Sequence, residues 1–131
     1  MSLPDDFRLP PRIEGLRCER CIVARTTADS RLTNEVSHLH LQLDGRWYQV
    51  ALDYGLIFWR AGVEPQTRED LWTLTDEASR LGIQGATVSE ARADDSGNAR
   101  GMKANLTIAF SNGQRIVLRG INGRTTMLLN P

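Results

Sequence analysis

The segment that decides the expected fold is residues 38–60, HLHLQLDGRWYQVALDYGLIFWR. Asp44-Gly45 and Tyr54-Gly55 divide it into three short runs in which apolar and polar residues alternate. Both dipeptides favour two-residue hairpin turns, and alternation is typical of strands with one buried face. The segment therefore predicts a three-stranded antiparallel meander.

The turn at Asp44-Gly45 also fixes which side chains share a face. A two-residue turn there places Leu41 opposite Tyr48 and Leu39 opposite Val50. One face is then expected in the core: Leu39, Leu41, Leu43, Tyr48, Val50 and Leu52. The other face collects polar side chains around two large rings: His38, His40, Gln42, Trp47, Gln49, Ala51, Phe58 and Arg60.

A second meander is expected near the C-terminus, with turns at Asn112-Gly113 and Asn122-Gly123. A three-residue loop 111–113 with a left-handed glycine pairs apolar residues with each other, Ile108 with Ile116 and Leu106 with Leu118, whereas a two-residue turn mixes apolar and charged partners. The preferred register turns a basic stripe outward, together with small polar residues and one valine: Lys103, Asn105, Thr107, Arg115, Val117 and Arg119.

Between the meanders, the pattern predicts one main helix over about 68–81. Thr67 is the expected N-cap, Asp70 follows three residues later, and Gly82 is the expected stop. The face predicted to be buried consists of Leu71, Leu74, Thr75, Ala78 and Leu81. Such a helix either covers the face of His38, His40 and Trp47 or leaves that face exposed.

These elements predict a single α+β domain over residues 1–131, with residues 1–16 as an extended lead-in. We expect one twisted antiparallel sheet of about seven to eight strands, curled toward a half barrel, with the helix against it. Further strands are expected over 18–27 and 86–92.

The cysteines and histidines are the candidates for a metal or catalytic site. Cys18, Cys21, His38 and His40 are the only cysteines and histidines. Zinc takes two thiolates and two imidazoles, but Cys18 and Cys21 point to opposite faces of an extended strand, and His38 and His40 lie on a strand rather than a helix. We therefore predict no metal and no cofactor. No phosphate-binding glycine motif or catalytic set is recognised either, so no enzyme is predicted.

The remaining class is a binding protein. A compact domain, charges segregated by region and a sheet face with rings and polar groups predict a small bacterial protein that covers a protein partner. Its size and composition are similar to those of toxin-neutralising immunity proteins, which would make the partner a cognate toxin. The expected contact residues are Trp47, Phe58, Arg60, His40 and Gln49.

Two alternatives remain open. The last 36 residues carry five basic residues and no acid, so they have a charge of +5 and the first 95 residues a charge of −5. Lys103, Arg115, Arg119 and Arg124 are thus candidates for binding an anionic ligand or nucleic acid, although nucleic acid is disfavoured because no aromatic ring accompanies them. The second alternative is a small-ligand or enzyme pocket inside a curled sheet.

Location was judged from the N-terminus and from hydropathy. The first residues lack a basic start followed by an apolar run, so no secretory signal is expected. No apolar run approaches the roughly 20 residues of a membrane-spanning helix. A cytoplasmic location is expected.

Overall fold

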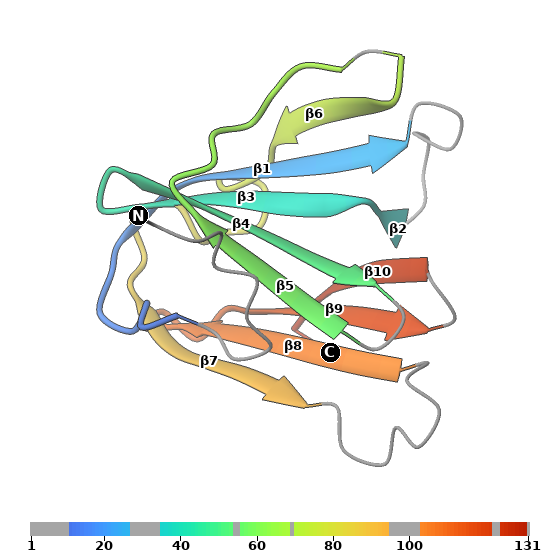
Figure 1. Ribbon diagram of the computed structural model, residues 1–131. Coiled ribbons are helices and arrows are strands. Elements are labelled where there is room, and N and C mark those ends of the chain that lie inside the picture. Colours follow the sequence, from blue (N-terminus) through green and yellow to red (C-terminus); the bar gives the residue numbers. More distant parts are fainter. Residues whose placement is uncertain are drawn as a thin grey trace, which may run out of the picture.

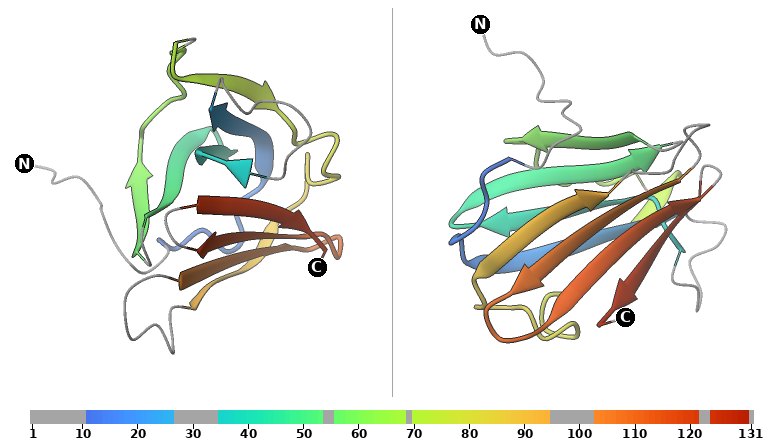
Figure 2. Two further views of the ribbon diagram at one scale, coloured as in Figure 1. Left: turned by 90° about the vertical axis from the view of Figure 1, so that its right-hand side faces the viewer. Right: turned by 90° about the horizontal axis from the view of Figure 1, so that it is seen from below.

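The structure is a computed structural model that describes residues 11–26, 35–53, 56–68, 70–94, 103–121 and 124–130. In these residues ten strands form two antiparallel five-stranded sheets, which lie face to face as a sandwich and do not close into a barrel (Figures 1 and 2). The described part of the chain contains no helix. The predicted α+β class, the single sheet and the half barrel are therefore wrong.

The first sheet has the strand order β5-β4-β3-β1-β6 and the second has the order β2-β10-β9-β8-β7. The strands of the first sheet are β1 (Cys18–Thr26), β3 (His38–Leu43), β4 (Arg46–Asp53), β5 (Leu56–Ala61) and β6 (Trp72–Asp76). Those of the second sheet are β2 (Glu35–Val36), β7 (Val88–Asp94), β8 (Lys103–Phe110), β9 (Arg115–Ile121) and β10 (Arg124–Leu129).

The predicted registers of both meanders are confirmed. Asp44 and Gly45 have positive φ angles of 48° and 79°, as a two-residue type I′ turn requires, and Leu41 pairs with Tyr48. In the second sheet Ile108 pairs with Ile116, and Gly113 has a φ of 89°. The turn residues at 54–55 and 122–123 lie outside the described residues, but Ala51 pairs with Phe58 as expected.

The core lies between the sheets and contains the residues predicted from alternation. Leu39, Leu41 and Leu43 are fully buried, and Leu106, Ile108 and Ile116 face them from the second sheet. Trp59 of β5 is also enclosed, with 1% of its surface exposed. Burial of this apolar surface is the main contribution to the stability of the sandwich.

The end of the predicted lead-in is part of the fold. Ile13 is fully buried, and the backbone N–H of Gly15 donates to Val88 O at 2.7 Å. The N–H of Val88 in turn donates to Leu16 O at 2.8 Å, so the start of β7 lies beside the segment that leads into β1. Residues 1–10 of the lead-in lie outside the described residues.

The segment predicted to be a helix over 68–81 is instead a turn, a strand and a second turn. Trp72–Asp76 is β6, which pairs with β1 from Ile22↔Asp76 to Thr26↔Trp72. Trp72, Thr73 and Thr75 are aromatic or β-branched residues, which favour strands, and pairing with β1 satisfies the backbone groups of both strands. Leu71, expected in the core, is 44% exposed.

Gly82, the predicted end of the helix, instead ends a single hydrogen-bonded turn at residues 77–81. The N–H of Leu81 donates to Glu77 O at 2.9 Å, and Gly82 has a φ of 70°. Ala78 and Leu81 are buried as predicted, each with 1% of its surface exposed. Ala78 and Leu81 therefore share a buried face as a helical spacing predicts, but only within this one turn.

A buried ion pair fixes this turn to β1. The carboxylate of Glu77 is 5% exposed and accepts hydrogen bonds from Arg25, which is 15% exposed, and from Arg80, which is 62% exposed. Burial raises the pKa of Glu77, but the two guanidinium groups outweigh it and leave the pKa below its ordinary value. Glu77 is therefore ionised at neutral pH.

We predict that Glu77→Ala lowers the free energy of unfolding by about 3 kcal/mol, because it leaves the largely enclosed Arg25 without this counter-ion. Arg80→Ala, which removes a mostly exposed partner of the same carboxylate, should cost less than about 1 kcal/mol. Urea unfolding of the three proteins at neutral pH tests this. Equal losses for the two variants would contradict the assigned role of Arg25.

Candidate functional site

The candidate site lies on the outer face of the first sheet, which is the face turned away from the core. A row of paired residues crosses all five strands there: Asp76 of β6, Ile22 of β1, His40 of β3, Gln49 of β4 and Arg60 of β5. Directly paired residues of antiparallel strands point to the same face. The meander β3-β4-β5 and the two strands β1 and β6 therefore build one surface.

A segment that we call the strap, residues 62–68, passes over this surface. It leaves the edge strand β5 and leads to β6 at the opposite edge of the sheet (Figure 1). Gly62 N–H donates to Trp47 O at 2.7 Å, Nδ1 of His40 donates to Val63 O at 3.2 Å, and Nε1 of Trp72 donates to Gln66 O at 3.0 Å. These bonds hold the strap at its start, over β3 and beside β6.

Beneath the strap, four rings form a chain of edge-to-face contacts. The centroids of Trp72 and His38 are 4.9 Å apart, those of His38 and His40 are 5.1 Å apart, and those of His40 and Trp47 are 6.5 Å apart. The interplanar angles lie between 77° and 90°, the range in which ring edges meet ring faces favourably. The guanidinium carbon of Arg20 lies 5.4 Å from the Trp47 ring centroid and extends the chain by a cation–π contact.

Both histidines are kept neutral by this environment. Burial, helped by the neighbouring His40, lowers the pKa of His38 to about 4. Burial also lowers the pKa of His40, although its hydrogen bond to Val63 O acts in the opposite direction. His40 is therefore the neutral tautomer that carries its proton on Nδ1.

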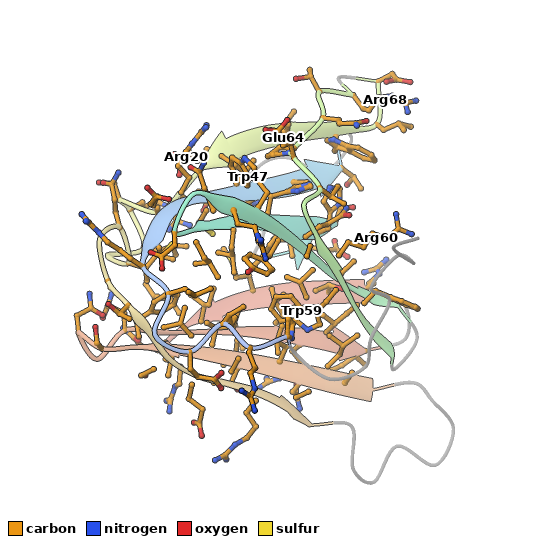
Figure 3. The ribbon with its side chains drawn as sticks, turned by 60° about the vertical axis from the view of Figure 1, so that its left-hand side comes forward. Arg20, Trp47, Trp59, Arg60, Glu64 and Arg68 are labelled. Carbon is orange, nitrogen blue, oxygen red and sulfur yellow. The ribbon has the colours of Figure 1, made fainter. Side chains whose placement is uncertain are left out.

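A pocket of about 410 Å³ opens between the strap and the sheet, next to Trp47. Its lining comes from β1, β4, the strap and β6: Arg20, Ile22, Trp47, Glu64, Pro65, Thr67, Leu74 and Asp76. Figure 3 shows Arg20, Trp47 and Glu64 gathered near β6, whereas Arg60 lies farther along the molecule. This volume is within the range of small-ligand sites, which run from about 300 to 1,000 Å³.

The pocket lining holds more negative than positive charge. Nε of Arg20 donates to Asp76 Oδ2 at 3.3 Å, so these two groups neutralise each other. Asp76 Oδ1 accepts from the backbone N–H groups of Cys21 and Ala78, each at 3.2 Å, which holds the carboxylate in place. Glu64 is exposed and forms no ion pair with any residue that the structure describes.

The residues predicted to contact a partner share this face but differ in accessibility. His40 and Trp47 are buried under the strap, with 2% and 9% of their surfaces exposed. Gln49 and Phe58 are half-buried, and Arg60 is exposed beside them on the edge strand. Among the described residues, the strap is therefore the element that covers this face, and it leaves Gln49 and Phe58 half-buried and Arg60 exposed.

The alternative basic set lies on the outer face of the second sheet. Arg119 pairs with Asn105 and Thr126, and Arg115 and Arg124 are also exposed on this face. Arg92 of β7, which the sequence analysis did not include, lies on the same face opposite Thr107. Lys103 pairs with Ile121 through its backbone, while its side chain lies outside the described residues.

The four residues weighed as zinc ligands lie on opposite faces of the first sheet. A β-bulge between Cys18 and Arg20 turns both cysteines into the core, so the prediction that they point to opposite faces is wrong. Burial raises the pKa of Cys18 to about 12 and that of Cys21 well above its ordinary value. In the described part of the chain no three metal-ligating side chains lie together.

Sequence reasoning missed Arg20, Glu64, Leu74 and Asp76 of the pocket. Trp72, Leu74 and Asp76 alternate with Thr73 and Thr75, and this period of two was the one signal of a strand that could carry pocket residues. The strap has no periodicity, so nothing in it predicts where Glu64 lies.

Comparison with protein-family models, with curated proteins and with solved structures finds no match to this chain. None of the described residues belongs to a helix long and apolar enough to cross a membrane.

We predict that the protein loses stability as the pH falls from about 7 to 5. The pKa values of both histidines are lower in the folded than in the unfolded protein. Their contribution to the free energy of unfolding is therefore fully present above pH 6.5, the ordinary pKa of histidine, and is lost as the pH falls toward about 4. The His38→Phe variant keeps a ring against Trp72 but removes one of the two titrating imidazoles. The stability of this variant should therefore depend less on pH than that of the wild type. Urea unfolding at several pH values from 7 to 5 measures this, and equal pH dependence in both proteins would contradict a neutral, buried His38.

Proposed function

We propose that this chain is a non-enzymatic bacterial binding protein that covers a protein partner with the outer face of the first sheet. Its more specific form is an immunity protein that neutralises a cognate toxin in the cytoplasm. The observation that carries the proposal is the partly exposed surface of Gln49, Phe58 and Arg60, which shares one sheet face with the strap and the pocket.

The chemistry of this surface supports a protein partner. Phe58 offers an incompletely buried ring, and Arg60 lies beside it on the neighbouring row of the edge strand. Aromatic and arginine side chains are among those that contribute most to binding energy at protein interfaces. His40 and Trp47 would act from beneath, by holding the strap and the shape of the surface.

The uneven distribution of charge along the chain supports a basic partner. The basic residues of the last 36 positions that the structure describes lie on β8, β9 and β10, in the second sheet, whereas the first 95 residues carry a net charge of −5. Opposite potentials speed up and orient association, and they disfavour wrong partners. We expect a toxin with a basic surface to be attracted by the net negative charge of the first 95 residues.

The test is coexpression with the product of the neighbouring gene, with bacterial growth and co-purification as readouts. Phe58→Ala with Arg60→Ala should abolish growth protection and weaken the complex by at least tenfold. The matched control is Ile121→Ala with Arg119→Ala, which removes an exposed apolar side chain and an arginine from the outer face of the second sheet. Retained protection and binding in the Phe58 and Arg60 variant, or equal loss in the control, would contradict the proposed surface.

A second candidate function is favoured by the arginines of the second sheet. Arg92, Arg115, Arg119 and Arg124 share its outer face. Near the edges of the sheet, Arg92 pairs with Glu90 at 3.2 Å and Arg124 pairs with Glu35 at 3.7 Å. Such a face could attract an anionic polymer through charge alone. The small polar residues between the arginines, Asn105, Thr107 and Thr126, provide no ring on which a base could stack.

We therefore predict weak, sequence-independent retention of the protein on double-stranded DNA at low salt, which disappears at physiological salt. Arg115→Ala with Arg119→Ala should remove the retention at low salt, while Phe58→Ala with Arg60→Ala should keep it. Binding that persists at physiological salt would favour this candidate over the protein partner.

A further inference from the structure

We propose that the pocket between the strap and the first sheet binds a guanidinium or ammonium group carried on an alkyl stem. An arginine or lysine side chain of the partner is the source that the surface favours, and that part rests on the function proposed above. A free organic cation has the same chemistry, and the experiment below separates the two sources.

The protein's own Arg20 shows which group this wall accepts. Its guanidinium lies over Trp47, with 5.4 Å between the guanidinium carbon and the ring centroid, and its Nε donates to Asp76 at 3.3 Å. A ring face and a carboxylate are the two groups that stabilise a planar cation best. Arg20 is half exposed, so it lines the pocket without filling it.

A second carboxylate remains for an incoming cation. Glu64 on the strap lines the same pocket, and Arg20 already has Asp76 as its partner. Arg68 is the one cation of the strap; its Nε lies 3.5 Å from Asp70 Oδ1, and it does not line the pocket. The lining therefore holds one cation and two carboxylates, and the excess negative charge belongs to Glu64.

The remaining walls suit an alkyl stem. Ile22 and Leu74 are neighbouring outer-face residues of β1 and β6, and Pro65 lies opposite them on the strap. These side chains have no polar groups, so they favour contact with the methylene groups of the ligand. The charged end of the ligand would then bind the carboxylates. Thr67 adds one hydroxyl to the lining.

The experiment follows the indole N–H signals of the three tryptophans by NMR, with Trp47→Phe to assign the Trp47 signal. The probe is N-acetylarginine methylamide, and N-acetylcitrulline methylamide is its neutral counterpart of the same shape. The arginine probe should shift the Trp47 signal saturably, and the citrulline probe should bind at least tenfold more weakly. Equal binding of the two probes, or no binding of either, would overturn the proposal.

Two variants test the assigned groups. Glu64→Gln should weaken the arginine probe about tenfold, as loss of one charge-assisted hydrogen bond predicts. Glu14→Gln is the control, because Glu14 is an exposed carboxylate outside the pocket. Arg20→Gln should strengthen binding, because it frees Asp76 and the face of Trp47. A Glu64→Gln variant that binds like the wild type would overturn the assignment.

Binding of the arginine probe to the complex with the partner distinguishes a partner side chain from a free organic cation as the natural occupant. If a partner side chain occupies the pocket, the arginine probe should displace the partner, and Glu64→Gln should weaken the complex. If probe and partner bind together, the pocket serves a free cation and the partner-borne source is excluded. A complex that depends on Phe58 and Arg60 while the probe fails to bind would overturn the pocket proposal and leave the proposed function standing.

Discussion

The pairing of β6 with β1 is the constraint on which the rest of the first sheet depends. β5 and β6 are consecutive in sequence but occupy opposite edges of the sheet, so the chain between them must cross one of its faces. The core occupies the inner face, which leaves the outer face for the strap. Burial of His38, His40 and Trp47, the neutral state of both histidines and the pocket lined by Glu64 all follow from this one crossing.

Local patterns predicted those parts of the fold that depend on neighbouring residues. A hairpin joins strands that are adjacent in sequence, so its turn residues and its alternation determine its register together, as Asp44-Gly45 and the loop 111–113 show. The strand β6 has no such neighbour. Its partner on β1 lies far back along the chain, and Leu71, Leu74, Ala78 and Leu81 also fit a helical spacing. The sequence of this segment fits the strand period of two almost as well as the helical period of 3.6 residues, and pairing with β1 selects the strand.

The candidate site could be predicted only in part, for the same reason. Alternation placed His40, Trp47, Gln49, Phe58 and Arg60 on one face, and the structure keeps them there. What covers that face depends on the path of the strap, which has no periodicity. The orientation of Cys18 and Cys21 depends on a β-bulge between Cys18 and Arg20, which no sequence pattern predicts. Burial then separates the five residues into two that hold the strap and three that a partner could reach.

Connectivity also explains why the two faces of the sandwich differ in charge. β7 to β10 form a continuous meander, so a sequence bias in this part of the chain remains within one sheet. Strand alternation then directs the apolar half of those residues to the core and the arginines to solvent. Glu90 and Glu35 meet Arg92 and Arg124 near the edges, and Arg119 lies in the middle of the face between Asn105 and Thr126. A chain with no net charge thereby presents one basic face and one face whose pocket is acidic.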